Sequence, residues 1–419
     1  MSLENREFWR DEKIAFLALS SMKGVGFWSL HKFAEAGLSF KEVLRDASNK
    51  IFENIKADQE GTEISAWQEE LWRDGLSLAR DLQAKDIKLV FQGEERFPPK
   101  LKNIPDAPFW IFVQGEYSNL FCKSVAVVGT RKPSADGDFL SKFSLAALAK
   151  AKCVTVSGLA LGVDQLAHIG SLRFNLKTIA VLGTGMLQNY PRGSELLRSE
   201  ILAGGGSIVT EYLPQQSYSA ENFVRRNRIQ AALCDLLIPV EWEIKSGTAH
   251  TVKFANRYGK KIVNLYLPGT YGDKPELEFS KDNYGAEALE IPTDIARLVN
   301  IIESETSEDQ LEENISNSAR YELSFFEKAQ GAMVVDERGT EKDGEIFSVE
   351  AEKTNAQSDL LAGDADVKAE VLSRVAGGLI PVKPKKRGGR RSGEKKSDSE
   401  DGPEKTHSPK EPGQFKLEI

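Results

Sequence analysis

The most regular feature of the chain is an alternation of β-rich and helical patterns between residues 124 and 267. Short apolar runs rich in Val, Ile and Leu are typical of buried strands, and the segments between them repeat apolar residues at helical spacing. Strands that alternate with helices form a parallel sheet covered on both faces. We therefore predict an α/β fold with a parallel sheet. The expected strands are residues 124–129, 154–158, 178–183, 207–212, 235–241 and 261–267.

The segments that flank this region have other patterns. Residues 13–21 and 27–36 carry apolar residues at helical spacing on either side of Met22–Gly26, which predicts a small helical unit. The Gly-x-Gly turn between these helices could face a DNA phosphate, or it could simply join two packed helices. The acidic run at residues 303–313 is typical of a linker, and from about Val371 the composition is typical of a disordered tail.

Charge is distributed unevenly along the chain. The 419 residues have a net charge of −8, but residues 383–396 alone carry eight Lys or Arg and one Glu. This basic tail could add nonspecific DNA affinity or could serve only as a solvated extension. Neither a long uncharged apolar run nor a signal peptide is evident, so we expect a cytoplasmic protein without a membrane partner. We expect Cys122, Cys153 and Cys234 to be buried reduced thiols.

The loops that follow the predicted strands are rich in cations and glycine. In a parallel sheet these loops gather at the carboxyl edge, where ligands bind. Together the cations could follow several successive phosphates of a nucleic acid, although any one of them could instead pair with a nearby glutamate such as Glu211. We place three of the arginines where a helix begins, the end at which positive charge is unfavourable without a bound anion. The six cations are Arg131, Arg192, Arg225, Arg226, Arg228 and Lys245.

Other functional classes find weaker support in the sequence. The first loop lacks the G-x-G-x-x-G pattern of a dinucleotide site, and no Walker A motif or metal-ligand cluster is present, so we predict no cofactor and no metal. Asp164 and His168 lie four residues apart and share a helix face. They could form an acid–base pair or a structural pair. Glu211 could likewise be catalytic, or could orient the arginines through a salt bridge.

Six motifs, in the same order, resemble the DprA/Smf family of DNA-processing proteins. The resemblance extends without large gaps over about residues 13–270, and residues 97–115 resemble the segment that precedes the Rossmann-like domain of that family. The N-terminal helices resemble its small helical, SAM-like domain. Many family members end in a winged-helix domain, in place of which this chain has its acidic linker and basic tail. The six motifs are residues 125–137, 156–168, 177–191, 204–214, 222–235 and 245–269.

The resemblance implies a domain organisation and a function. It implies a protein that binds single-stranded DNA without reading sequence, protects incoming strands and loads a RecA-type recombinase in natural transformation. It also implies a homodimer joined through the Rossmann-like domain, and no enzymatic activity or catalytic residue. The expected parts are a helical SAM-like domain at 1–85, a connecting segment at 86–120, a Rossmann-like domain at 121–300, an acidic linker at 301–370 and a disordered basic tail at 371–419.

Particular residues follow from the family motifs. The arginine of the G-[ST]-R motif and the basic residue after Tyr-Pro contact phosphates in the family, and here these are Arg131 and Arg192. Tyr190 could stack on an unstacked base, or could be an ordinary buried tyrosine. The expected DNA-binding set is Gly129, Thr130, Arg131, Lys132, Ser157, Gly158, Gly183, Thr184, Gly185, Tyr190, Arg192, Arg225, Arg226, Asn227, Arg228, Lys245, Ser246 and Gly247.

The main alternative is a nucleotide-binding sensor or a nucleotide phosphoribohydrolase of the lysine-decarboxylase-like type. Those proteins bind phosphate through a P-G-G-x-G-T-x-x-E region, which this chain matches only at Gly247 and Thr248. The position of the catalytic glutamate is occupied by Thr251. The hydrolase hypothesis therefore lacks its catalytic residue.

Overall fold

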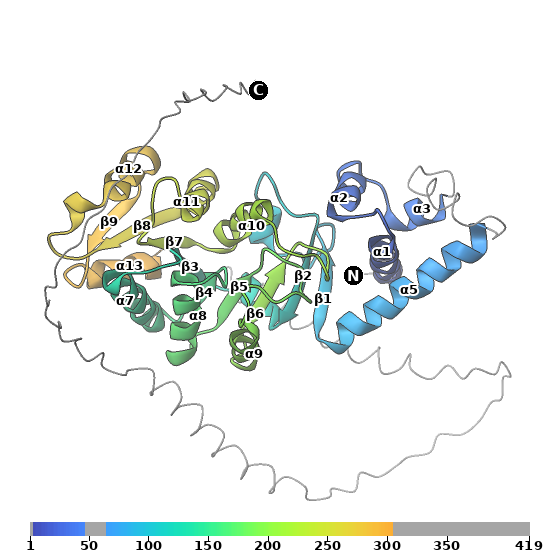
Figure 1. The fold of residues 1–419 in the computed structure, drawn as a ribbon, viewed down its shortest axis with the longest axis horizontal. Helices are drawn as coiled ribbons and strands as arrows, with labels where there is room; N and C mark the ends of the chain where they lie inside the picture. The colour runs from blue at the N-terminus through green and yellow to red at the C-terminus, as the bar shows by residue number, and fades with distance from the viewer. Residues whose placement is uncertain (1–2, 47–63, 305–419) are drawn as a thin grey trace, which may run out of the picture. The chain divides into compact units, whose positions relative to one another are not determined.

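The computed structural model describes residues 3–46 and 64–304, which belong to one compact unit, Met1–Val335 (Figure 1). Of the predicted acidic linker at 301–370, all but the first four residues lie outside the described part of the chain, and so does the predicted basic tail at 371–419. Within the described ranges no helix combines the length and the apolarity needed to cross a bilayer.

A nine-stranded sheet with the order β1-β2-β6-β5-β4-β3-β7-β8-β9 organises the described residues. Neighbouring strands from β6 to β9 are parallel, whereas β2 is antiparallel to both β1 and β6. All six predicted strands are confirmed, and all but β3 are one or two residues shorter than expected. The strands are β1 (Ile87–Phe91), β2 (Trp110–Gly115), β3 (Ser124–Gly129), β4 (Val154–Ser157), β5 (Thr178–Val181), β6 (Ser207–Thr210), β7 (Leu236–Val240), β8 (Lys261–Tyr266) and β9 (Glu287–Glu290).

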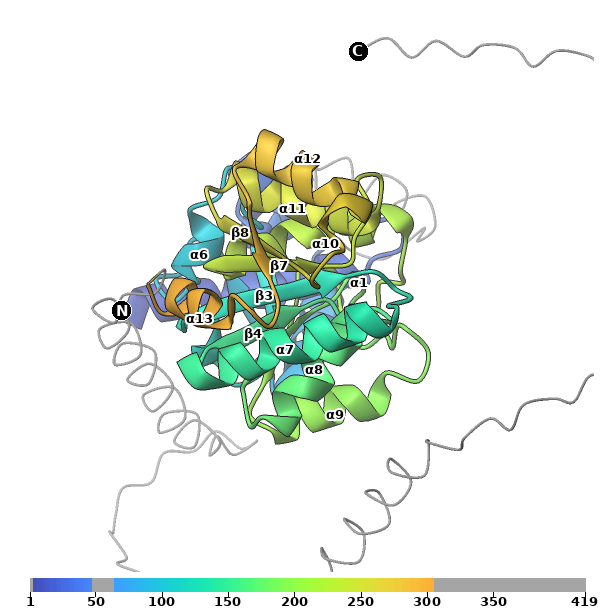
Figure 2. The same cartoon turned by 90° about the vertical axis from the view of Figure 1, so that its left-hand side faces the viewer.

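Helices cover both faces of this sheet, which confirms the predicted fold class. Figure 2 shows α7, α8 and α9 below the sheet and α10, α11 and α12 above it. Alternate residues of a strand point to opposite faces, so Val125 and Val127 pack with α7 and α8, while Ala126 and Val128 pack with α10 and α11. The helices are α7 (Ala135–Ala151), α8 (Val163–Arg173), α9 (Glu195–Ala203), α10 (Ala220–Leu233), α11 (Gly247–Arg257), α12 (Pro275–Tyr284) and α13 (Ile295–Ser304).

The predicted N-terminal helices are also present, and they pack on the edge of the sheet formed by β1 and β2. Phe16 is fully buried, with its ring centroid 4.8 Å from that of Trp110 and 5.5 Å from that of Phe91. One apolar cluster therefore joins the helical unit to the sheet. These elements are α1 (Leu3–Ser21), α2 (Phe27–Glu35), α3 (Phe40–Arg45) and α5 (Ile64–Ala84), and the remaining short helices are α6 (Pro99–Lys102), η2 (Tyr117–Phe121) and η3 (Tyr271–Asp273).

Strands β1, β2 and β9 are not anticipated by the sequence pattern. β1 and β2 lie in the segment read as a connection, yet they extend the sheet beyond β6. The three cysteines are free thiols, as predicted, but Cys122 is only partly buried. Burial raises the pKa of Cys153 and of Cys234 to about 11, so both thiols are protonated at neutral pH.

We expect Phe16→Ala to destabilise the protein by about 3–5 kcal/mol, because it leaves a cavity between the helices and the sheet. Leu38→Ala is the matched control: its side chain is 46% exposed, so its effect should stay within about 0.5 kcal/mol. Urea unfolding followed by circular dichroism measures both values. An equal, small effect of the two changes would contradict a core shared by the N-terminal helices and the sheet.

Candidate nucleic-acid interface

The carboxyl edge of the parallel strands contains a topological switch point. β3 has β4 on one side and β7 on the other, and the chain leaves β3 and β7 toward opposite faces of the sheet. The crevice between two loops that diverge in this way is the usual ligand site of an open α/β sheet. The two loops are tied together, because the backbone N–H of Ser134 donates to Glu241 Oε2 at 2.8 Å. The structure thus brings the loops after β3 and β7 side by side, as the sequence predicted.

Two glycines of the neighbouring loop permit close approach of the backbone. Gly162 has φ +83°, a left-handed conformation that favours glycine. A Cβ atom at Gly158 would lie 2.5 Å from Nη1 of Arg226, so a side chain there would displace that guanidinium. Of the predicted loop residues, Ser157, Gly158, Gly183, Thr184 and Gly185 are buried under the edge, and Gly129, Thr130 and Ser246 are half-buried.

Four of the predicted cations are exposed at this edge. Arg131 and Lys132 lie after β3, Arg192 after β5 and Lys245 after β7. Within residues 3–46 and 64–304, none of these four side chains forms an ion pair. Their positive charge is therefore available to an external anion.

Three aromatic side chains lie beside these cations. The ring centroid of Tyr190 is 4.5 Å from that of Tyr218 and 4.9 Å from that of Phe223. The guanidinium carbon of Arg131 lies 5.9 Å from the Phe223 centroid. Tyr218 is 58% exposed and Tyr190 is half-buried. The sequence pointed to Tyr190 alone. Tyr218 and Phe223 follow β6, in the loop and at the start of α10, and join the cluster because this segment meets the loop after β5.

Arg226 is buried and holds two strand ends together. Its Nη1 donates to the carbonyl oxygen of Gly158 at 2.6 Å and also to that of Val181. Asn227 Nδ2 donates to the carbonyl oxygen of Gly247 at 3.1 Å. These two neighbours on α10 thus connect the loops after β4, β5 and β7. Whether either residue also contacts DNA stays a prediction.

Arg225 and Arg228 lie on another face of α10 and share the carboxylate of Glu211. Arg228 Nη2 donates to Glu211 Oε2 at 2.6 Å, and Arg225 Nε lies 3.3 Å from Oε1. The Arg225 guanidinium also covers the ring of Trp28, with 4.8 Å between its carbon and the centroid, and it contacts His31 at 3.2 Å. The salt-bridge alternative for Glu211 is the one observed.

The expected position of the three arginines at the beginning of a helix is wrong. α10 begins at Ala220, with Ser219 as the capping residue whose Oγ accepts from Asn222 N. Arg225 is therefore more than one turn inside the helix. The unfavourable interaction with the helix dipole falls off within the first turn, so it does not explain these charges. Their explanation lies in the buried acceptors that each guanidinium finds.

Asp164 and His168 form part of a buried polar network below the edge. His168 Nδ1 lies 2.8 Å from Oγ1 of Thr178, inside the fold. Burial, assisted by the charge of Arg226, lowers the pKa of His168 to about 3. Burial raises the pKa of Asp164 against the opposing influence of Arg226. His168 is fully buried against Thr178, and Asp164 is bonded to Ser157. These contacts favour a structural role for each residue, with partners other than each other, over an acid–base pair.

Comparisons with known proteins agree with this geometry. A model of the family described as DNA recombination-mediator protein A matches residues 88–299. DprA of Streptococcus pneumoniae is 34% identical over 59% of this chain and 88% of its own length, and Smf of Borreliella burgdorferi is 30% identical over 66% and 90%. Smf of Escherichia coli is 34% identical over 46% of this chain, but this match spans only about half of the relative (51%).

One solved structure is similar to part of this chain. The structure of DNA processing protein A from Helicobacter pylori, reported with its single-stranded DNA binding mode, is 26% identical with a TM-score of 0.47. It covers 53% of this chain and 97% of its own.

The buried His168 should make stability fall as the pH is lowered. Its pKa is about 3 in the folded protein and about 6.5 in the unfolded chain, so below about pH 6.5 only the unfolded state takes up the proton. This should cost about 2 kcal/mol of stability between about pH 7 and pH 5.

Urea unfolding of wild type and His168→Leu at both pH values measures the effect. Leucine does not titrate, so the variant should lose about 2 kcal/mol less than wild type over this interval, whatever its absolute stability. Parallel losses in the two proteins would show that His168 is not neutral in the fold.

Proposed function

The chain belongs to the DNA recombination-mediator protein A family, and on that premise we propose that its carboxyl edge binds single-stranded DNA without reading sequence. The supporting observation is the set of four exposed cations without an ion-pair partner among the described residues: Arg131, Lys132, Arg192 and Lys245. Lys and Arg side chains that contact phosphates supply affinity that is independent of sequence.

The aromatic cluster favours a single strand over a duplex. The rings of Tyr190, Tyr218 and Phe223 lie next to Arg131, so a strand that follows the cations passes these rings. Only unstacked bases can lie on aromatic side chains, and such stacking tolerates every base. A cationic path with adjacent rings is therefore suited to a flexible strand whose bases are free.

The buried residues of α10 have a supporting role in this proposal. Arg226 and Asn227 hold the loops after β4, β5 and β7 by donating to carbonyl oxygens of those loops. The glycine-rich loops leave backbone amides near the path proposed for the DNA strand. In this arrangement Arg226 and Asn227 determine the shape of the edge, while the exposed cations contact phosphates. No step of this function needs a catalytic group, and we propose binding without catalysis.

The proposal extends to a recombinase partner. A recombination mediator acts between DNA and the recombinase that uses it, so we propose that the bound strand is protected and then transferred to a RecA-type protein, with the mediator acting as a homodimer. A strand-exchange assay on DNA coated with single-strand-binding protein tests this role. Stimulation of the recombinase by the full chain supports it, and absence of stimulation with bound DNA contradicts it.

Replacing Arg131 and Arg192 together by alanine should weaken oligonucleotide binding and reduce its salt dependence. Each phosphate contact with a single strand contributes about −0.7 to the slope of log affinity against log salt concentration, so the double variant should lose about 1.4 from the slope. Fluorescence anisotropy of a labelled oligonucleotide over a salt series measures both quantities.

The matched control is Arg173→Ala. Arg173 is an exposed arginine in the last turn of α8, so its charge is available to solvent like that of Arg131. Because α8 begins at the carboxyl edge and runs back along the sheet, its last turn is remote from the proposed path. An unchanged slope in the double variant, or an equal change in Arg173→Ala, would refute the phosphate path.

Tyr190→Ala should weaken oligonucleotide binding by about 1–3 kcal/mol, the usual value of one stacked base. The salt slope should stay at its wild-type value, since the tyrosine is uncharged. Tyr190→Phe keeps the ring and should bind like wild type. If the phenylalanine variant were as weak as the alanine variant, the hydroxyl rather than the ring would be responsible and the stacking role would fail.

A further inference from the structure

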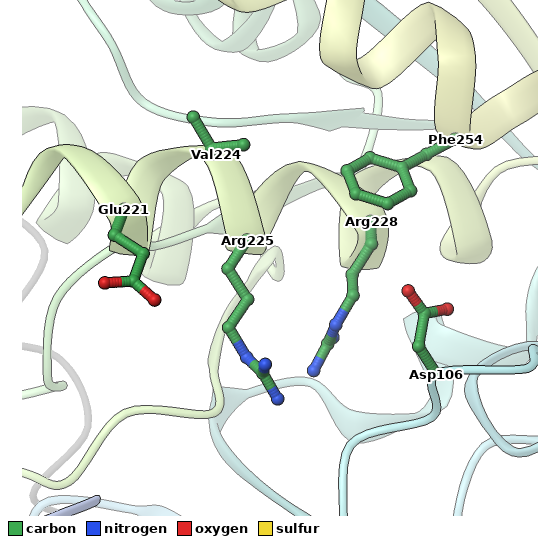
Figure 3. Close-up of a pocket in the computed structure, with 6 residues that line it drawn as sticks. All are labelled: Asp106, Glu221, Val224, Arg225, Arg228 and Phe254. Carbon is green, nitrogen blue, oxygen red and sulfur yellow. The ribbon is translucent and has the colours of Figure 1, made fainter. Parts of the chain in front are cut away.

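A separate cavity of about 250 Å³ lies against a different face of α10. Four of its lining residues follow the spacing of one helix face, so they point away from Phe223, Arg226 and Asn227, which face the loops. Figure 3 shows the side chains of Arg225 and Arg228 extending in the same direction, with Asp106 opposite Arg228. The lining residues are Asp106, Glu221, Val224, Arg225, Arg228 and Phe254.

Arg228 brings buried hydrogen-bond donors to this cavity. Its side chain is 2% exposed, and Nη2 is bonded to Glu211. Its Nε and Nη1 find no hydrogen-bond acceptor within the described residues. Buried polar groups are nearly always hydrogen-bonded, and leaving a charged donor without an acceptor is unfavourable. These unpaired donors belong to a residue that lines the cavity, and a ligand with acceptor oxygens would satisfy them.

The two guanidinium groups that line the cavity share one buried carboxylate, while the lining carboxylate of Glu221 is exposed to solvent. Glu211 is the shared partner of Arg225 and Arg228 at 3.3 and 2.6 Å, so two positive charges share one negative charge. The carboxylate of Asp106 is already engaged, since it accepts from the hydroxyl of Tyr258 and lies 3.5 Å from Arg257. Guanidinium groups in this situation bind phosphate oxygens through short, charge-assisted hydrogen bonds.

We propose that this cavity binds a phosphate monoester carried by a nucleotide, with the phosphate on Arg225 and Arg228. Val224 and Phe254 supply the apolar wall of the site. The same chemistry is offered by a free mononucleotide and by the terminal phosphate of a DNA strand. The site does not depend on DNA binding at the carboxyl edge.

Isothermal titration calorimetry of the full chain with 2′-deoxycytidine 5′-monophosphate tests the site. We expect binding, with at least about tenfold weaker affinity for deoxycytidine, which lacks the phosphate; a tenfold change corresponds to about 1.4 kcal/mol. Two variants should each lower the affinity for the mononucleotide by about tenfold or more. Val224→Phe fills the cavity, and Arg228→Lys removes donors but keeps the charge beside Glu211. Thermal unfolding followed by circular dichroism verifies that both variants are folded.

Arg131→Ala separates this site from the carboxyl edge. It should weaken oligonucleotide binding while leaving the affinity for the mononucleotide within about twofold, a change below about 0.5 kcal/mol. Absence of mononucleotide binding in the wild type overturns the site. Wild-type affinity for the mononucleotide in folded Val224→Phe and Arg228→Lys overturns it as well, and so does loss of mononucleotide binding in Arg131→Ala. Failure of oligonucleotide binding alone affects only the proposed function.

Two oligonucleotides identify the source of the phosphate. Each titration with the mononucleotide is repeated in the presence of a saturating oligonucleotide that carries either a 5′-phosphate or a 5′-hydroxyl group. If only the 5′-phosphorylated oligonucleotide prevents binding of the mononucleotide, the ligand is the end of a DNA strand. Blocking by neither strand identifies the free nucleotide. Equal blocking by both strands places the mononucleotide at the carboxyl edge and overturns the proposal.

Discussion

The buried arginines of α10 are the constraint on which the shape of the carboxyl edge depends. A guanidinium group stays charged under all ordinary conditions, so a buried one must find oxygen acceptors. Arg226 finds the carbonyl oxygens of Gly158 and Val181, and Arg228 finds the carboxylate of Glu211. These bonds connect one helix to the ends of β4, β5 and β6. Removing a partner would leave a buried charge without compensation, a loss of about 3–5 kcal/mol.

The same bonds explain how consecutive arginines serve different purposes. Successive helix positions are rotated by about 100°, so Arg225 and Arg226 point to different surroundings although they are adjacent in sequence. Arg226 lies below the glycine-rich loops, and Arg225 reaches the N-terminal helices, where it covers Trp28. The helix thereby links the loop edge, the end of β6 and the helical unit. The cations that can contact a DNA strand are therefore the exposed ones on the loops.

The connection to the helical unit also has an apolar part. Phe16 packs on Trp110, and the indole N–H of Trp110 donates to the carbonyl oxygen of Glu211 at 2.7 Å. The apolar cluster thus ends at the residue whose carboxylate pairs with Arg225 and Arg228. Packing between α1 and β2 therefore supports the ion pairs of Arg225 and Arg228 with Glu211. A change in the position of the N-terminal helices would be transmitted to the arginines through Trp110 and Trp28.

The sequence by itself determined the parallel α/β fold, the six central strands and the loops that meet at their carboxyl edge. It could do so because strand and helix periodicity are local, and because parallel connectivity forces the loops to one edge. It did not anticipate β1, β2 and β9. β1 and β2 join the sheet through the pairing of β2 with β6, which is distant in sequence, and β9 is a short strand that begins and ends with glutamate. The loop positions and the family motifs pointed to Arg131 and Arg192 as well as to Arg226 and Arg228. Only the tertiary structure separated exposed cations from buried ones, because burial and partner choice depend on how α10 packs against β4, β5 and β6.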